Sequence, residues 1–167
     1  MYSFDARLRY SECGSDGRLT FAALLDYFQD ACFFQSEDRG VGISRLYEKK
    51  RAWVLSSWQI VVKKLPTFGG TVTVTTLPYE LKGFYGLRNV ALCVKTREEK
   101  GMEADAYKRK ETGQREKDGS GKGEGYAQYP EIDDESCFAY ANSVWIYLDT
   151  ETGKPARIDE EMRRAYT

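Results

Sequence analysis

Histidine is absent from this 167-residue chain. Its absence excludes Ser-His-Asp and Cys-His catalytic sets, metal sites with histidine ligands, and the commonest general base near neutral pH. We therefore expect that any catalysis by this chain alone uses carboxylates.

Long apolar runs are also absent. No stretch approaches the roughly 18 apolar residues that a membrane-spanning helix needs, and residues 1–10 lack the apolar core of a signal peptide. The 25 basic and 26 acidic side chains nearly cancel, and no basic patch with interleaved aromatic residues indicates a nucleic-acid partner. The sequence predicts a cytoplasmic protein that binds neither membranes nor nucleic acid.

Cysteine is sparse and shows no metal-binding spacing. Cys13, Cys32, Cys93 and Cys137 are scattered without any C-x-x-C pair, which argues against a zinc site or a redox pair. We expect all four thiols to be reduced and most of them to pack in the interior.

One long helix is predicted near the N-terminus. Thr20 is a suitable N-cap residue, and the charged run before Gly40 is typical of a helix end. Between them, apolar residues recur at helical spacing: Leu24, Leu25, Tyr27, Phe28, Ala31, Cys32 and Phe34. Because this apolar stripe is wide, we expect the helix to be buried on more than one side.

The remaining periodic segments predict strands. Their ranges are 2–10, 52–65, 71–77, 84–94 and 138–148, with a loop or short helical turn at 44–50, a turn at 149–155 and a short helix from Asp159. The two runs that flank Pro66–Gly70 are interpreted as a hairpin. The order of strand, long buried helix and successive antiparallel strands indicates an α+β hotdog fold, an antiparallel sheet wrapped around one long central helix.

The segment 96–135 has a different composition from the rest of the chain. Half of its residues are charged, and glycines alternate through Asp118–Gly125. Such a segment has too few apolar residues to form a core. We interpret it as a charged, largely mobile insertion, with a helical turn near Glu103–Glu111, in a single hotdog domain that spans residues 1–167.

Several stretches, in order along the chain, resemble the acyl-[acyl carrier protein] thioesterases of fatty acid synthesis. They are Leu24–Ala31, Trp53–Ile60, Lys82–Asn89, Ala141–Leu148, Thr152–Ile158 and the acidic Asp159–Glu161. The resemblance implies a fatty acyl thioester hydrolase built from two hotdogs. Its implied partner is acyl carrier protein that carries a fatty acyl-phosphopantetheine, and no metal or organic cofactor is implied.

In that family the catalytic residues belong to a Leu-Asp-x-Asn-x-His-Val-Asn-Asn motif in the second hotdog. No Asn-x-His occurs here, so no catalytic residue can be transferred. The sequence stops at Thr167, where the resemblance places the linker to that second hotdog. We therefore expect the N-terminal, substrate-binding half without the catalytic half, and we expect it to pair with a second hotdog or with another copy of itself.

The resemblance also implies substrate-binding residues. Leu87, Arg88 and Asn89 match positions that help to set acyl chain length, since side chains at the end of an apolar tunnel gain or lose about 0.8 kcal/mol per buried methylene. The aromatic residues Tyr27, Phe28 and Trp58 are interpreted mainly as core, with some expected to line the tunnel. Basic residues are candidates for contacting the acidic carrier protein: Lys63, Lys64, Lys82 and Arg88.

Carboxylates on the long helix and in the loop after the first strand are weaker candidates for catalysis. Asp26 and Asp30 lie four residues apart on one helix face, where burial could raise a pKa toward neutrality. In single-hotdog thioesterases an Asp in the loop after the first strand is often the catalytic carboxylate. Here that position is Gly14, so Glu12 or Asp16 would have to take the role of this Asp. A turn role for Asp16 is the simpler interpretation.

Two alternatives to the half-enzyme stay open at this point. One is a stand-alone homodimeric hotdog that hydrolyses acyl-CoA or acyl-ACP with carboxylates. The other is a non-catalytic hotdog that binds acyl thioesters without turnover. A hotdog dehydratase is disfavoured because it needs an active-site histidine.

Overall fold

The computed structural model describes residues 1–95 and 136–166. Its elements, in chain order, are β1 (Tyr2–Arg7), the short 3-10 turn η1 (Tyr10–Glu12), α1 (Phe21–Asp38), α2 (Ile43–Glu48), β2 (Arg51–Val62), β3 (Thr71–Lys82), β4 (Tyr85–Val94), β5 (Cys137–Asp149) and α3 (Glu160–Tyr166). The predicted insertion at 96–135, with its helical turn, lies outside the described residues. No helix within the described ranges is long and apolar enough to cross a membrane.

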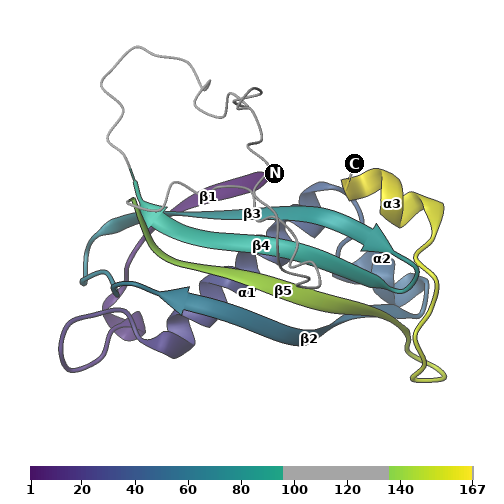
Figure 1. Cartoon of the computed structure of the whole chain (residues 1–167), viewed down its shortest axis with the longest axis horizontal. Helices are drawn as coiled ribbons and strands as arrows, with labels where there is room; N and C mark the ends of the chain where they lie inside the picture. The colour runs from purple at the N-terminus through teal and green to yellow at the C-terminus, as the bar shows by residue number, and fades with distance from the viewer. Residues whose placement is uncertain (96–135, 167) are drawn as a thin grey trace, which may run out of the picture. The chain divides into compact units, whose positions relative to one another are not determined.

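The described strands form one antiparallel sheet in the order β1-β3-β4-β5-β2. Helix α1 lies across one face of this sheet, as Figure 1 shows. The helix begins where the sequence predicts, because the Thr20 hydroxyl oxygen accepts a hydrogen bond from the Ala23 N–H at 3.2 Å.

The main core lies between α1 and the sheet. Leu24, Phe28 and Ala31 of α1 are fully buried, and Phe28 stacks on Trp58 of β2 with ring centroids 5.4 Å apart. The sheet contributes inward-facing residues from alternate positions of its strands, among them Val72, Val74, Val90, Leu92, Ala139 and Ala141. The prediction of a long helix buried against an antiparallel sheet is therefore confirmed.

The predicted hairpin across Pro66–Gly70 is wrong. β2 pairs with β5 at one edge of the sheet, whereas β3 pairs with β1 and β4. The connecting loop bonds instead to the loop after β1: the Leu19 N–H donates to the Pro66 carbonyl at 2.8 Å and the Phe68 N–H donates to the Gly17 carbonyl at 2.8 Å. These long-range bonds hold the loop in a crossover, which a local turn pattern does not reveal.

A tight hairpin does occur between β3 and β4. Lys82 lies opposite Tyr85, so only Gly83 and Phe84 form the turn. Gly83 has a positive φ of 59°, a conformation that glycine adopts without steric cost.

The expectation that all four cysteines are reduced is also wrong. Cys93 of β4 and Cys137 of β5 form a disulfide, while Cys13 and Cys32 are free. The two cysteines are 44 positions apart in sequence but lie opposite each other in the β4–β5 register. The antiparallel pairing of these strands therefore brings together two thiols that no local spacing connects.

We expect the Cys93→Ser/Cys137→Ser double variant to be less stable than the parent chain. A disulfide that closes a loop of 44 residues contributes about 4 kcal/mol in the chain-entropy model. Denaturant unfolding of both proteins measures the difference, with Cys13→Ser as the control. Thiol titration of the denatured, unreduced chain provides an independent check, since four reactive thiols instead of two would contradict the pairing.

Candidate functional site

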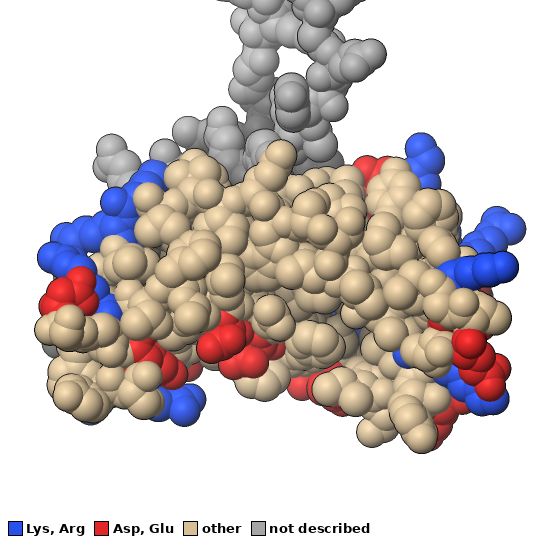
Figure 2. Space-filling model, turned by 90° about the horizontal axis from the view of Figure 1, so that it is seen from below, with Lys and Arg blue, Asp and Glu red and all other residues tan. Residues whose placement is uncertain are grey.

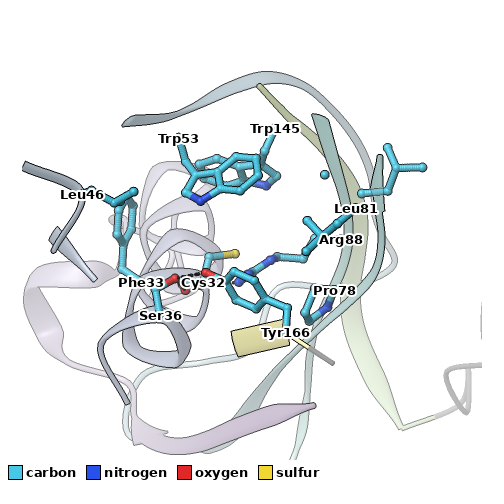
Figure 3. Close-up of a pocket in the computed structure, with 12 residues that line it drawn as sticks. Cys32, Phe33, Ser36, Leu46, Trp53, Pro78, Leu81, Arg88, Trp145 and Tyr166 are labelled. Atoms are coloured by element: carbon cyan, nitrogen blue, oxygen red, sulfur yellow. Dashed lines mark hydrogen bonds between the residues drawn. The ribbon is translucent and has the colours of Figure 1, made fainter. Parts of the chain in front are cut away.

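A cavity lies beside α1 and is lined by residues of the three helices and of the sheet. α1 contributes Cys32, Phe33 and Ser36, and α2 contributes Leu46. The remaining lining residues are Trp53 of β2, Pro78 and Leu81 of β3, Gly86, Leu87 and Arg88 of β4, Trp145 of β5, and Tyr166 of α3. Figure 3 shows Trp53 and Trp145 on one side of the cavity, and Arg88 and Tyr166 on the other.

Arg88 is the charged residue of this otherwise largely apolar cavity. Its side chain points from β4 toward α1, and the residue is only 8% exposed. Its Nη1 donates a hydrogen bond to the Cys32 carbonyl at 3.2 Å, and the guanidinium lies over the Tyr166 ring, 5.3 Å from the centroid. No carboxylate of the described residues forms an ion pair with it.

Tyr166 closes one side of the cavity. Its hydroxyl lies 2.6 Å from the Ser36 hydroxyl, so a hydrogen bond joins α3 to α1. Arg163 adds a second link, because its Nη1 donates to the Leu81 carbonyl at 2.9 Å. The cavity wall on this side therefore depends on how α3 is held.

Ion pairs between α2 and α3 fix the position of the short helix. Arg45 donates two hydrogen bonds to the Glu161 carboxylate, at 2.8 and 3.0 Å, and the Lys49 ammonium lies 2.8 Å from Asp159. The Arg45 and Lys49 side chains lower the pKa of Glu161 to about 2. All four side chains remain partly exposed, so each pair contributes little by itself.

We expect Glu161→Gln to loosen α3 and lower the melting temperature slightly at pH 7. The Glu161 pKa falls from an ordinary value of 4.5 to about 2 on folding, so its contribution is fully present above pH 4.5. That contribution decreases as the pH falls and is lost below about pH 2. Melting curves of parent and variant should therefore differ at neutral pH and converge in acid.

Glu160→Gln is the matched control for this measurement. Among the described residues, Glu160 forms its ion pair with Arg164 of its own helix, four residues away. A loss equal to that of Glu161→Gln, or one that persists unchanged at pH 2, would contradict a role for the α2–α3 ion pairs.

The predicted substrate-binding residues fall into separate places. Leu87 and Arg88 line the cavity. Asn89 does not, because it forms a hydrogen bond with Asn142, whose Nδ2 lies 2.9 Å from the Asn89 Oδ1. Phe28 and Trp58 stack in the core outside the cavity lining.

The interpretation of Arg88 as a surface contact for a carrier protein is wrong, because the residue is buried. Lys63, Lys64 and Lys82 are exposed, and their role toward a carrier protein stays a prediction. Their positions differ, since Lys63 and Lys64 follow β2 while Lys82 ends β3.

The three candidate carboxylates lie near one another at the start of the chain and on α1. The Glu12 carboxylate accepts hydrogen bonds from the Tyr27 hydroxyl and the Arg9 N–H, both at 2.8 Å. Partial burial raises the pKa of Asp30, and the charge of Asp26 adds to this rise. Both aspartates are nevertheless exposed, so this group is a half-solvated cluster outside the cavity.

Asp16, the other candidate in this loop, has a structural role. Its Oδ1 accepts a hydrogen bond from the Arg18 N–H at 3.0 Å, which is the turn interaction that the sequence predicts. Burial and the Glu12 hydrogen bond raise the pKa of Tyr27 far above its usual range, so Tyr27 stays a neutral donor.

Sequence reasoning missed Ser36, Trp145 and Tyr166 as cavity residues. Trp53 and Trp145 both face inward on their strands, and β2 and β5 are neighbours, so their rings meet the same space. The alternation within each strand indicates that both tryptophans face inward. To place them at one cavity also requires the order of the strands in the sheet, and the wrongly predicted hairpin gave a different order. No cluster of potential metal ligands occurs among residues 1–95 and 136–166.

A five-stranded antiparallel sheet around one long helix, with a cavity between them, defines a hotdog-fold protein. Solved structures confirm this fold. The chain aligns with a putative oleoyl thioesterase from Lactobacillus plantarum at a TM-score of 0.73 and 19% identity, over 99% of this chain and 50% of that one. It aligns with a 1,4-dihydroxy-2-naphthoyl-CoA thioesterase from Synechocystis at a TM-score of 0.70 and 8% identity, over 99% and 94% of the two chains.

The sequence model of the acyl-ACP thioesterase N-terminal domain matches residues 1–107, and the chain belongs to the acyl-ACP thioesterase family. An acyl-ACP thioesterase structure from Bacteroides thetaiotaomicron aligns at a TM-score of 0.65 and 23% identity, over 92% of this chain and 48% of that one. The chain thus spans about half the length of this protein and of the Lactobacillus protein. No curated protein sequence matches it.

Proposed function

We propose that this chain is the substrate-binding N-terminal hotdog of an acyl-ACP thioesterase, a cytoplasmic enzyme of fatty acid biosynthesis. Its substrate is a fatty acyl group on the phosphopantetheine arm of acyl carrier protein, and water is the final acceptor. The observation that carries the proposal is the largely apolar cavity beside α1 in a chain of this family.

The cavity is suited to acyl recognition by its walls. Trp53, Trp145, Leu87 and Leu46 present apolar surface, which favours a chain of methylenes over a polar ligand. Leu87 belongs to the segment that sequence resemblance connects with chain length, and it lies at this cavity. We assign it a role in setting acyl length without a role in the chemistry.

The second hotdog of the proposed enzyme needs a surface on which to pair, and the β2 edge of the sheet is suited to this. β2 is twelve residues long and pairs with β5 on one side, while β1 at the opposite edge has only six residues. No described strand pairs with the other side of β2. Val54, Val61 and Val62 are exposed along it.

Figure 2 views the molecule from the side on which β2 lies: uncharged residues cover the upper middle of this face, acidic residues lie along its lower middle, and charged residues of both signs lie at its ends. An uncharged strand edge of this length readily accepts another strand. We propose that it receives the second hotdog or, in this chain alone, the same edge of another copy.

We expect the isolated chain to be a dimer that Val54→Lys/Val61→Lys converts to a monomer. Lysine on an edge strand opposes pairing because two like charges must approach across the interface. Sedimentation velocity measures the state, and Ser3→Lys on the β1 edge is the matched control. If Ser3→Lys dissociates the dimer, or if the dimer persists in Val54→Lys/Val61→Lys, the interface does not lie at the β2 edge.

Thiol release from acyl-ACP and acyl-CoA panels tests the activity. We expect turnover by a longer polypeptide that continues into a second hotdog, and a rate at least about 10²-fold lower for the 167-residue chain, because general acid–base groups contribute factors of this size. Equal turnover by both would contradict the half-enzyme.

A second candidate is the stand-alone carboxylate thioesterase, and the grouping of Glu12, Tyr27 and Asp30 favours it. The raised pKa of Asp30 is the direction that a general base requires. If the 167-residue chain hydrolyses acyl thioesters, Glu12→Gln and Asp30→Asn should each abolish this activity. Asp38→Asn, at the exposed end of α1, should leave it unchanged.

A further inference from the structure

The cavity contains a buried cation without a counter-ion. Arg88 is more than nine-tenths buried, uses one N–H in its bond to the Cys32 carbonyl, and forms no ion pair with a carboxylate of the described residues. A guanidinium carries five N–H donors, and burial of a charge without an anionic partner is costly. The remaining donors are therefore available to a ligand with acceptor oxygens.

The opposite wall of the cavity is aromatic. Trp145 donates its Nε1 hydrogen bond to the Ser143 hydroxyl at 2.9 Å, so its ring face is left for apolar contact. The buried Nε1 of Trp53 has no hydrogen-bond partner in the structure. Figure 3 shows both indole rings facing Arg88 across the cavity, which places an apolar surface opposite a charged one.

We propose that this cavity binds a carboxylate attached to an apolar chain, with Arg88 pairing with the carboxylate and the chain lying against Trp53 and Trp145. A single guanidinium matches a monoanion, and planar bidentate pairing is the geometry that carboxylates and guanidiniums share. A phosphate dianion fits less well, because one charge would stay unpaired among apolar walls.

The size of the cavity adds a requirement. Its volume is about 30 Å³, which holds little more than a water molecule. A chain can enter only when a wall moves, and Tyr166 is the wall residue that ends the short helix α3 and lies over the guanidinium. Displacement of this ring exposes the cation, so the incoming carboxylate replaces the aromatic face as its partner.

Two sources supply such a ligand, and the inference rests on the proposed function for both. One is the free fatty acid that thioester hydrolysis releases, which would make the cavity a product site. The other is an acyl group that carries a second carboxylate at its far end, which would make the cavity a selector of substrates. The shared chemistry is a carboxylate on a chain.

The first test uses the parent chain and two ligands of the same shape, octanoate and octanamide. Tryptophan fluorescence reports binding because Trp53 and Trp145 line the cavity. We expect octanoate to bind at least about tenfold more tightly, since a charge-assisted hydrogen bond is typically worth this factor or more. Equal affinities would overturn the proposal without any variant.

Variants then test whether Arg88 provides the preference. Arg88→Met should remove the advantage of octanoate while octanamide binding changes little, and Arg88→Lys should retain part of it. Arg39→Met, at the exposed end of α1, is the matched control. Melting curves show which variants are folded, and a folded Arg88→Met that still prefers octanoate would overturn the assignment.

Pantetheine thioesters separate the two sources. Octanoyl-pantetheine is compared with the same thioester bearing a carboxylate on its last carbon. Tighter, Arg88-dependent binding of the carboxylated thioester identifies the acyl group as the source, and a preference confined to octanoate identifies the free acid. Hydrolysis by the longer polypeptide is measured in parallel. Turnover without any preference for a carboxylate ligand overturns this inference alone. A carboxylate preference that depends on Arg88, without thioester hydrolysis by the longer polypeptide, overturns only the proposed function.

Discussion

The packing of α1 into the concave face of the sheet is the interaction on which the rest of the structure depends. Leu24, Phe28 and Ala31 are completely buried there, and each contacts side chains from strands that are distant in sequence. Burial of one large apolar side chain is worth about 1.5 to 3 kcal/mol, so this interface supplies much of the stabilisation that orders the strands around the helix. The cavity lies beside this interface, where Arg88 and the two tryptophans of the sheet meet residues of α1, α2 and α3.

Sequence reasoning predicted the elements of this fold well and their pairing less well. The helix from Phe21 follows from the Thr20 cap and the apolar spacing, both of which are local properties. The loop 66–70 has turn residues too, but its partner strand is decided by distant contacts such as the Leu19 N–H with the Pro66 carbonyl. Local residues can show that a chain turns, and only long-range bonds determine which strand it then joins.

The same limit applies to the site. Resemblance marked Leu87, Arg88 and Asn89 together, yet only Leu87 and Arg88 reach the cavity, while the Asn89 side chain bonds to Asn142. The sequence also suggested that Arg88 contacts a carrier protein, because a basic residue is usually exposed. Its burial contradicts that interpretation, because a guanidinium among apolar walls can contact a small ligand that enters the cavity but not the surface of another protein.

The way α3 is held is compatible with a cavity that must open. Its ties to the rest of the fold include the Ser36–Tyr166 hydrogen bond, the contact of Arg163 with the Leu81 carbonyl, the packing of the fully buried Met162, and ion pairs with partly exposed side chains. Exposed ion pairs contribute little individually and reform readily in water, so they position a helix without locking it. The strongest single tie is the burial of Met162, which lies outside the cavity lining, and Tyr166 at the end of the helix can therefore move while the helix stays anchored. Because the Tyr166 ring that contacts the Arg88 guanidinium can be displaced, the proposed cavity has two states. In the closed state the ring covers the guanidinium, and in the open state an anion pairs with it.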